Sequence, residues 1–194
     1  MEILEKILGN SARVKIMRLF LLNRNKIFTN KDIVQRSRVS AEVVRRELKL
    51  LLSVGFIKKR GDGNWSFNFA FKYGEEFQDL LVRSDSLNNE TILNNFKKVG
   101  RVKLVIASGL FIKNEDSRVD LLIVGDKLSK AKIEEGMRKL EAEIGAELVY
   151  AVFDTKEFLY RLNMYDKLVR DILDYPHEVL LQAKELSTQA LKKA

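Results

Sequence analysis

The sequence is poor in residues that carry redox chemistry and metal binding, because its 194 residues include no cysteine and one histidine. The absence of cysteine excludes disulfides, thiolate zinc sites and a cysteine nucleophile, and a single histidine leaves little for metal binding through imidazole. No stretch approaches the roughly 20 apolar residues of a membrane helix, and the first residues lack the basic and then apolar order of a signal peptide. We therefore expect a cytoplasmic protein with no metal site and no membrane contact.

The positive charge of the chain is concentrated in its first part. Apolar residues make up 46% and charged residues 32% of the sequence, which is typical of globular proteins, and the length allows two small domains. The net charge is +8, yet residues 1–75 contain 16 Lys and Arg against 7 Asp and Glu, whereas residues 76–194 contain 19 against 20. This asymmetry indicates a nucleic-acid-binding module joined to a neutral one. The alternatives are a solvated basic surface and a patch for anionic membrane.

An amphipathic helix followed by a β-hairpin is predicted over residues 39–71. Ser40 can cap the helix with its hydroxyl, and apolar residues as far as Leu52 recur on one face at helical spacing. Two strands, the second alternating in aromatic residues to the end of this range, flank a turn at 61–64 whose residues tolerate positive φ. Polar and charged residues follow the opposite helix face and the turn: Glu42, Arg45, Arg46, Lys49, Lys58, Lys59, Arg60 and Asn64.

Two helices precede this segment. Ser11 opens the first, with Arg13, Lys15 and Arg18 expected on its exposed face, and Thr29 caps the second. Helix, short helix, turn, helix and hairpin is the order of a winged helix-turn-helix. Residues 39–57 resemble the recognition helix and following strand of arsenical-repressor-like transcription regulators, and the resemblance extends over about residues 10–72.

This resemblance implies specific contacts with double-stranded DNA. It places Ala41 and Glu42 toward the major groove, with Glu42 accepting a hydrogen bond from cytosine. Arg45 or Arg46 reads guanine, and Lys49 and the hairpin cations hold phosphates. The candidate DNA-binding residues are Ser40, Ala41, Glu42, Arg45, Arg46, Lys49, Lys58, Lys59, Arg60 and Asn64.

The second part of the chain alternates strands and helices. Aliphatic runs predict strands over 102–108, 119–124 and 148–153, with a capped helix from Ser129 to Ile144. A long helix from Thr155 to Pro176 and a further amphipathic helix from His177 complete the pattern. We therefore expect three regions: a winged helix-turn-helix domain over 1–74, a helical linker over 75–98, and an α/β domain with C-terminal helices over 99–194.

Residues 103–176 resemble the minimal nucleotidyltransferase fold of the polymerase β superfamily. The motifs that carry the resemblance run from Ser108 to Phe111 and from Asp116 to Asp126. Active members use a Gly-Ser pair to hold a triphosphate, and an Asp-x-Asp pair with a third carboxylate to bind two magnesium ions. Here Leu110 replaces the serine and Arg118 the first aspartate, and a permanently charged guanidinium repels a metal cation. The resemblance thus implies a catalytically inactive domain, not an enzyme.

Such a domain can still bind a ligand. In one hypothesis a nucleotide effector is held without metal by Ser108, Gly109, Lys113, Arg118 and Asp120. In the other, the cations belong to a loop, Asp120 ends that loop or pairs with Arg118, and the domain serves for dimerisation. No cofactor is expected, and magnesium is needed only if the domain is active.

The sequence predicts an α+β protein in which an N-terminal winged helix-turn-helix domain precedes a small α/β nucleotidyltransferase-like domain with C-terminal helices. The expected function is that of a sequence-specific transcription regulator, which binds double-stranded DNA as a homodimer and uses an inactive second domain for dimerisation or for a nucleotide or protein effector. Two alternatives remain open: an active metal-dependent nucleotidyltransferase with a nucleic-acid-binding winged helix, and a partner-binding module of a toxin–antitoxin pair.

Overall fold

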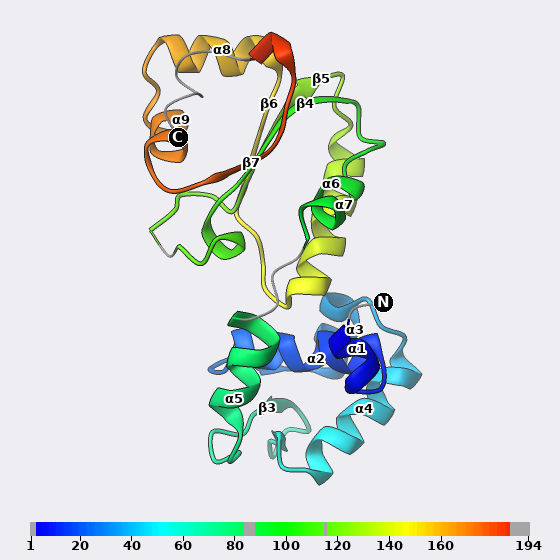
Figure 1. The fold of residues 1–194 in the computed structure, drawn as a ribbon. Coiled ribbons are helices and arrows are strands. Elements are labelled where there is room, and N and C mark those ends of the chain that lie inside the picture. The colour runs from blue at the N-terminus through cyan, green and yellow to red at the C-terminus, as the bar shows by residue number, and fades with distance from the viewer. Residues whose placement is uncertain (1–2, 84–87, 115, 187–194) are drawn as a thin grey trace. The chain divides into compact units, whose positions relative to one another are not determined.

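The computed structural model describes residues 3–83, 88–114 and 116–186, and its architecture is mixed α+β, as predicted (Figure 1). The chain divides into two compact units. The first comprises residues 1–86 and 138–147, and the second comprises residues 87–137 and 148–194. The first unit therefore contains a short segment that lies far along the sequence from the rest of it.

Helices form most of the first unit. They are α1 (Ile3–Ile7), α2 (Ser11–Leu22), α3 (Asn30–Ser37), α4 (Ala41–Ser53) and α5 (Gly74–Gln78), which continues as a π-helical turn over Asp79–Arg83. The predicted cap at Thr29 is confirmed, because its side chain accepts a hydrogen bond from the backbone N–H of Asp32, whose carboxylate accepts one from Thr29 in return. Ser40 occupies the N-cap position of α4, but its hydroxyl makes no capping hydrogen bond, so that part of the prediction was wrong.

A small antiparallel sheet, with the strand order β1-β3-β2, completes this unit. Its strands are β1 (Ile27–Phe28), β2 (Ile57–Lys59) and β3 (Trp65–Phe67). The predicted turn is present, since the N–H of Arg60 donates to the carbonyl of Asn64 at 2.8 Å and Gly63 has φ +83°. Strand β3 is shorter than the strand predicted there, which ran to residue 71. It ends at Phe67, and the chain turns after it, since the N–H of Phe71 donates to the carbonyl of Asn68 at 2.9 Å.

Aromatic side chains pack edge to face within the largely aliphatic core of the first unit. The rings of Phe20 and Phe28 meet edge to face at 5.5 Å, as do those of Phe56 and Phe67. Leu48 of α4 is 1% exposed against this core. The hairpin and α4 are therefore fixed to one hydrophobic cluster.

Arg18 is 4% exposed, which corrects the prediction that it lies on the wet face of α2. Its guanidinium donates to the carbonyl of Leu81 at 2.9 Å and to that of Glu143 at 3.0 Å. Glu143 belongs to the last turn of α7 (Lys130–Ile144), where carbonyls lack intrahelical partners and a cation is favoured. A tertiary contact that the local pattern does not reveal therefore turns Arg18 inward.

A four-stranded sheet forms the centre of the second unit. The strands β4 (Arg101–Ala107), β5 (Leu121–Asp126), β6 (Tyr150–Phe153) and β7 (Glu178–Gln182) take the order β6-β5-β4-β7, with only β5 and β6 parallel. The helices are α6 (Asn89–Asn94), the first part of α7, α8 (Thr155–Asn163) and α9 (Lys167–Asp174), with 3-10 turns at Gly109–Phe111 and Lys184–Leu186. Phe158 of α8 and Ile172 of α9 pack on Leu104 and Leu122 of the sheet.

Two predictions for the end of the chain were wrong. The long helix from Thr155 to Pro176 is two helices, because Tyr165 adopts φ +54° and Asp166 caps α9 by accepting from the N–H groups of two following residues. The predicted helix from His177 is strand β7, since pairing with β4 satisfies its backbone. The rest of that predicted helix, from residue 187 on, lies outside the described residues.

Gly145 allows the end of α7 to approach α2 closely. It has φ +90°, and a Cβ atom there would lie 2.6 Å from backbone atoms of both Arg18 and Leu19. We expect Gly145→Ala to lower the free energy of unfolding by about 1–3 kcal/mol, because a methyl group adds strain at positive φ and a backbone clash.

The matched control for this substitution is Gly61→Ala, because no atom lies within 4 Å of a Cβ at Gly61. Its expected change is within about 0.5 kcal/mol. Urea unfolding of both variants measures the difference, and equal shifts would contradict this role for Gly145.

Candidate nucleic-acid interface

Helix α4 buries one face and exposes a charged one. Val44, Leu48 and Leu51 are buried, whereas the predicted charged residues Glu42, Arg45, Arg46 and Lys49 are exposed, as are Ser40 and Ala41. Leu52, which was expected on the buried face, is 40% exposed. Arg45 and Lys49 form no ion pair with any residue that the structure describes. Their charge is therefore available to a ligand in solution.

Glu47 is the second acid of α4, and it is buried at 1% exposure. Its carboxylate accepts hydrogen bonds from Nε of Arg13 at 2.8 Å and from Nδ2 of Asn10 at 3.1 Å, and Nε of Arg46 lies 3.5 Å away. Burial raises the pKa of Glu47, but these hydrogen bonds outweigh it, so the pKa lies below its ordinary value. Glu47 therefore attaches α4 to the start of α2. Glu47 was not among the predicted residues, because a glutamate at this position follows no apolar pattern.

The hairpin carries the second group of predicted DNA contacts. Lys58, Lys59 and Arg60 are exposed along β2 and at its end, and the Nζ of Lys59 lies 5.9 Å from the centre of the Trp65 ring. The side chain of Asn64 donates to Asp62 at 2.7 Å within the turn. These cations thus follow a hairpin whose tip is ordered by its own hydrogen bonds.

Three exposed cations near these elements were missing from the predicted set: Lys26, Lys31 and Arg38. Lys31 follows Asn30, whose side-chain carbonyl accepts a hydrogen bond from the Trp65 indole at 2.8 Å, so the start of α3 lies beside the hairpin. Arg38 ends α3 with φ +54° and lies two residues before Ser40. The excess of Lys and Arg over residues 1–75 indicated that this part of the chain has further exposed cations. It does not indicate which of them lie near α4 and the hairpin.

In the second unit, three of the predicted nucleotide-binding residues, Ser108, Gly109 and Asp120, hold the backbone of the surrounding loop in place. Asp120 is 8% exposed, and its two carboxylate oxygens accept hydrogen bonds from the N–H groups of Leu110 and Val149, both at 2.8 Å. The hydroxyl of the buried Ser108 donates to the carbonyl of Val119 at 2.5 Å. Gly109 has φ +54°, and a Cβ there would collide with Asp120. Both carboxylate oxygens of Asp120 are therefore engaged in hydrogen bonds with the backbone.

The loop cation Arg118 takes no part in these contacts. Arg118 pairs with Asp171 of α9 at 2.9 Å, so the predicted pairing of Arg118 with Asp120 was wrong. Lys113 is exposed with φ +60°. Among the described residues, no three His, Cys, Asp or Glu side chains gather as a metal site would require. The same residues contain no helix with the length and apolarity needed to cross a bilayer.

Comparison of the chain with family models, with curated proteins and with solved structures finds no match in any of the three.

The buried carboxylate of Glu47 predicts a pH-dependent contribution to stability. Its folded-state pKa is lowered, so the contribution is present above the unfolded-state pKa of about 4.3 and is lost as the pH falls through the folded value. We expect Glu47→Gln to lower the free energy of unfolding by about 1–3 kcal/mol at pH 7 and by less at pH 3.

Urea unfolding at the two pH values measures this difference. Glu42→Gln is the control on the same helix, and its effect should stay under about 1 kcal/mol, the size of a surface charge's interaction with the helix dipole. A Glu47→Gln penalty that did not shrink at pH 3 would show that the carboxylate charge is not what stabilises α4.

Proposed function

We propose that the protein is a sequence-specific DNA-binding transcription regulator, in which α2, α3, α4 and the β2–β3 hairpin act as a winged helix-turn-helix. The observation that carries the proposal is the exposed face of α4, where Arg45 and Lys49 have no ion-pair partner among the described residues. Lys58 on the hairpin is likewise exposed and has no ion-pair partner among the described residues. Exposed cations on a helix and on the adjoining hairpin fit a phosphate backbone and a major groove.

The two groups of residues take different roles in this proposal. The guanidinium of Arg45 or Arg46 donates two hydrogen bonds to N7 and O6 of guanine, and Glu42 accepts one from N4 of cytosine. Phosphate contacts come from the cations that surround this face, and they set the register without reading sequence. These cations are Lys49, Lys58, Lys59 and Arg60, together with Lys26, Lys31 and Arg38.

A homodimer on a pseudo-palindromic site is part of the proposal. Winged-helix regulators place two recognition helices about one helical turn of DNA, roughly 34 Å, apart. The first helix offers an apolar surface for a second copy, since Ile3 is 76% and Ile7 is 71% exposed at a spacing of four residues.

The second unit acts in this proposal as an inactive nucleotidyltransferase-like domain for dimerisation or effector binding. Both carboxylate oxygens of Asp120 accept backbone hydrogen bonds, and Arg118 pairs with Asp171. A two-metal mechanism needs carboxylates that are free to bridge cations. The geometry around Asp120 therefore favours a regulator over a metal-dependent transferase.

Two substitutions should separate base reading from phosphate binding. We expect Arg45→Ala to weaken binding to the preferred site by about 1–3 kcal/mol and to relax preference at one base pair, because a bidentate contact is lost. Lys58→Ala should weaken binding to all duplexes alike and reduce the salt slope by about one unit. Fluorescence anisotropy with cognate and scrambled duplexes at several salt concentrations measures both effects.

Arg170→Ala is the control, because Arg170 is an exposed arginine of α9 that pairs with Asp174 on its own helix. Its affinity for DNA should match that of the unaltered protein. The assignment of α4 and the hairpin fails if Arg45→Ala and Lys58→Ala also bind like the unaltered protein.

A further inference from the structure

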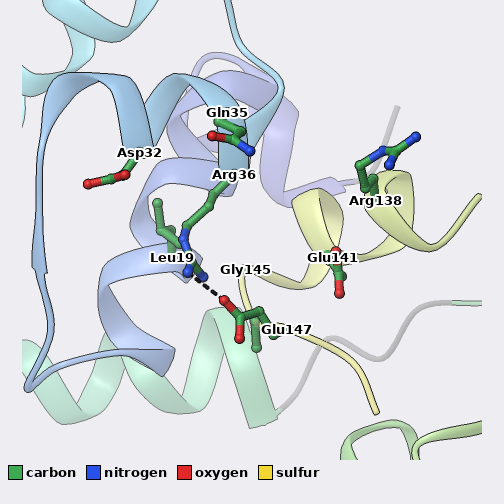
Figure 2. A pocket seen from close by; sticks show the side chains of 9 residues that line it. Leu19, Asp32, Gln35, Arg36, Arg138, Glu141, Gly145 and Glu147 are labelled. Atoms are coloured by element: carbon green, nitrogen blue, oxygen red, sulfur yellow. Dashed lines mark hydrogen bonds and ion pairs between the residues drawn. The ribbon is translucent and has the colours of Figure 1, made fainter. Parts of the chain in front are cut away.

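The first unit contains a polar cavity of about 230 Å³ between α3 and the end of α7 (Figure 2). Leu19 of α2 and the backbone around Gly145 form part of its wall. The charged and amide side chains come from α3 and from the segment that ends α7: Asp32, Gln35, Arg36, Arg138, Glu141 and Glu147. None of these residues belongs to the exposed face of α4, so the cavity is distinct from the proposed DNA interface.

The contacts that hold the end of α7 against α2 keep the wall of this cavity in place. The side-chain amide of Asn23, which is 8% exposed, donates to the carbonyls of Leu19 and Gly145, both at 2.8 Å. Lys15 pairs with Glu143 at 2.6 Å. A cavity whose walls are fixed in this way is formed before a ligand arrives, as is usual for small-molecule sites.

An ion pair bridges the cavity. Figure 2 shows Arg36 directed at Glu147, and their closest nitrogen and oxygen are 2.5 Å apart. The side chains are 32% and 64% exposed, and a pair so open to water contributes little to stability. A ligand can therefore replace either partner with little loss. Asp32 is not available in the same way, because its carboxylate accepts from the backbone and hydroxyl of Thr29 in the helix cap.

The size and charge of the cavity restrict what it can hold. Its volume equals that of about eight water molecules, and it is smaller than a site for a drug-sized molecule. A simple anion on Arg36 would leave Glu147 unpaired, whereas a simple cation on Glu147 would leave Arg36 unpaired. A zwitterion satisfies both groups.

We infer that this cavity binds a free α-amino acid. The carboxylate of the ligand takes the place of Glu147 on the planar guanidinium of Arg36, which suits bidentate binding. The ammonium of the ligand takes the place of Arg36 on Glu147. The Arg36 guanidinium is also held over the ring of Phe28 at 5.7 Å, which limits its movement.

The ligand should also change DNA affinity, and this second part rests on the proposed function. Gln35 and Arg36 lie in the last turns of α3, which ends at Ser37 and leads into α4 after a short turn. Exchange of the Arg36–Glu147 pair for ligand contacts alters how α3 is tied to the end of α7. We expect a change in affinity for the preferred DNA site of at least about fivefold when the cavity is filled.

Calorimetric titration of the full chain with each of the twenty common amino acids tests the binding site. At least one should bind, and its matched analogues that lack either the carboxylate or the ammonium should bind at least about tenfold more weakly. Arg36→Gln and Glu147→Gln should each weaken binding by a similar factor. Arg170→Gln, which breaks an exposed ion pair in α9, should leave it unchanged.

Several outcomes would overturn the inference. These are the absence of binding by all twenty amino acids at millimolar concentration, equal binding by a single-charge analogue, and binding that neither cavity variant weakens. Thermal unfolding checks that each variant is folded. If Arg36→Gln does not fold, the binding measured with Glu147→Gln, whose side chain is the more exposed, tests the site alone.

The same titrations, repeated with DNA, separate the site from its regulatory role. Amino-acid binding with unchanged DNA affinity would overturn the regulatory part alone. If no duplex binds at all, the proposed function fails, whereas the binding site is still judged by the calorimetry and its variants.

Discussion

The ion pair between the buried Glu47 of α4 and the partly exposed Arg13 of α2 sets both the position and the charge of the proposed DNA-binding helix. The carboxylate of Glu47 is 1% exposed and accepts from Arg13 at 2.8 Å. Removing Arg13 would leave the buried carboxylate of Glu47 without its main charge partner, which is destabilising. The pair also turns one of the two acids of α4 away from solvent. The exposed face therefore keeps the positive potential of Arg45 and Lys49, opposed only by Glu42.

Among the described residues, some cations hold the fold together through ion pairs and hydrogen bonds, and others are left to solvent. In the first unit, Arg13 of α2 binds the carboxylate of Glu47 on α4, and Arg18 of α2 donates to the carbonyl of Glu143 at the end of α7. In the second unit, Lys103 of β4 lies between Asp126 at 2.8 Å and Glu185 at 2.6 Å, and these carboxylates raise the pKa of Lys103. By contrast, Lys58 of the hairpin has no such partner among the described residues. Structural cations are thus neutralised, whereas Lys58, like Arg45 and Lys49, is left to solvent on the surface where nucleic acid is proposed to bind.

Local patterns predicted those elements whose boundaries are set by local chemistry. The cap at Thr29 and the turn before Asn64 were found because their hydrogen bonds lie within a few residues. Arg18 and Glu47 were misplaced or missed because their partners are distant in sequence, and periodicity assigns charged side chains to the surface. The strand β7 was taken for a helix because a short apolar run fits both periods, and only its pairing with β4 decides between them.

Selection of binding sites from random duplex DNA, followed by titration of the selected site at several salt concentrations, shows whether this protein binds DNA sequence-specifically. We expect a pseudo-palindromic site, with half-sites one helical turn apart, bound at least about a thousandfold more tightly than random DNA. We also expect affinity to fall with salt, because phosphates are contacted by lysine and arginine. Steep salt dependence without any enriched sequence would contradict sequence-specific binding, since a basic surface alone binds all duplexes alike.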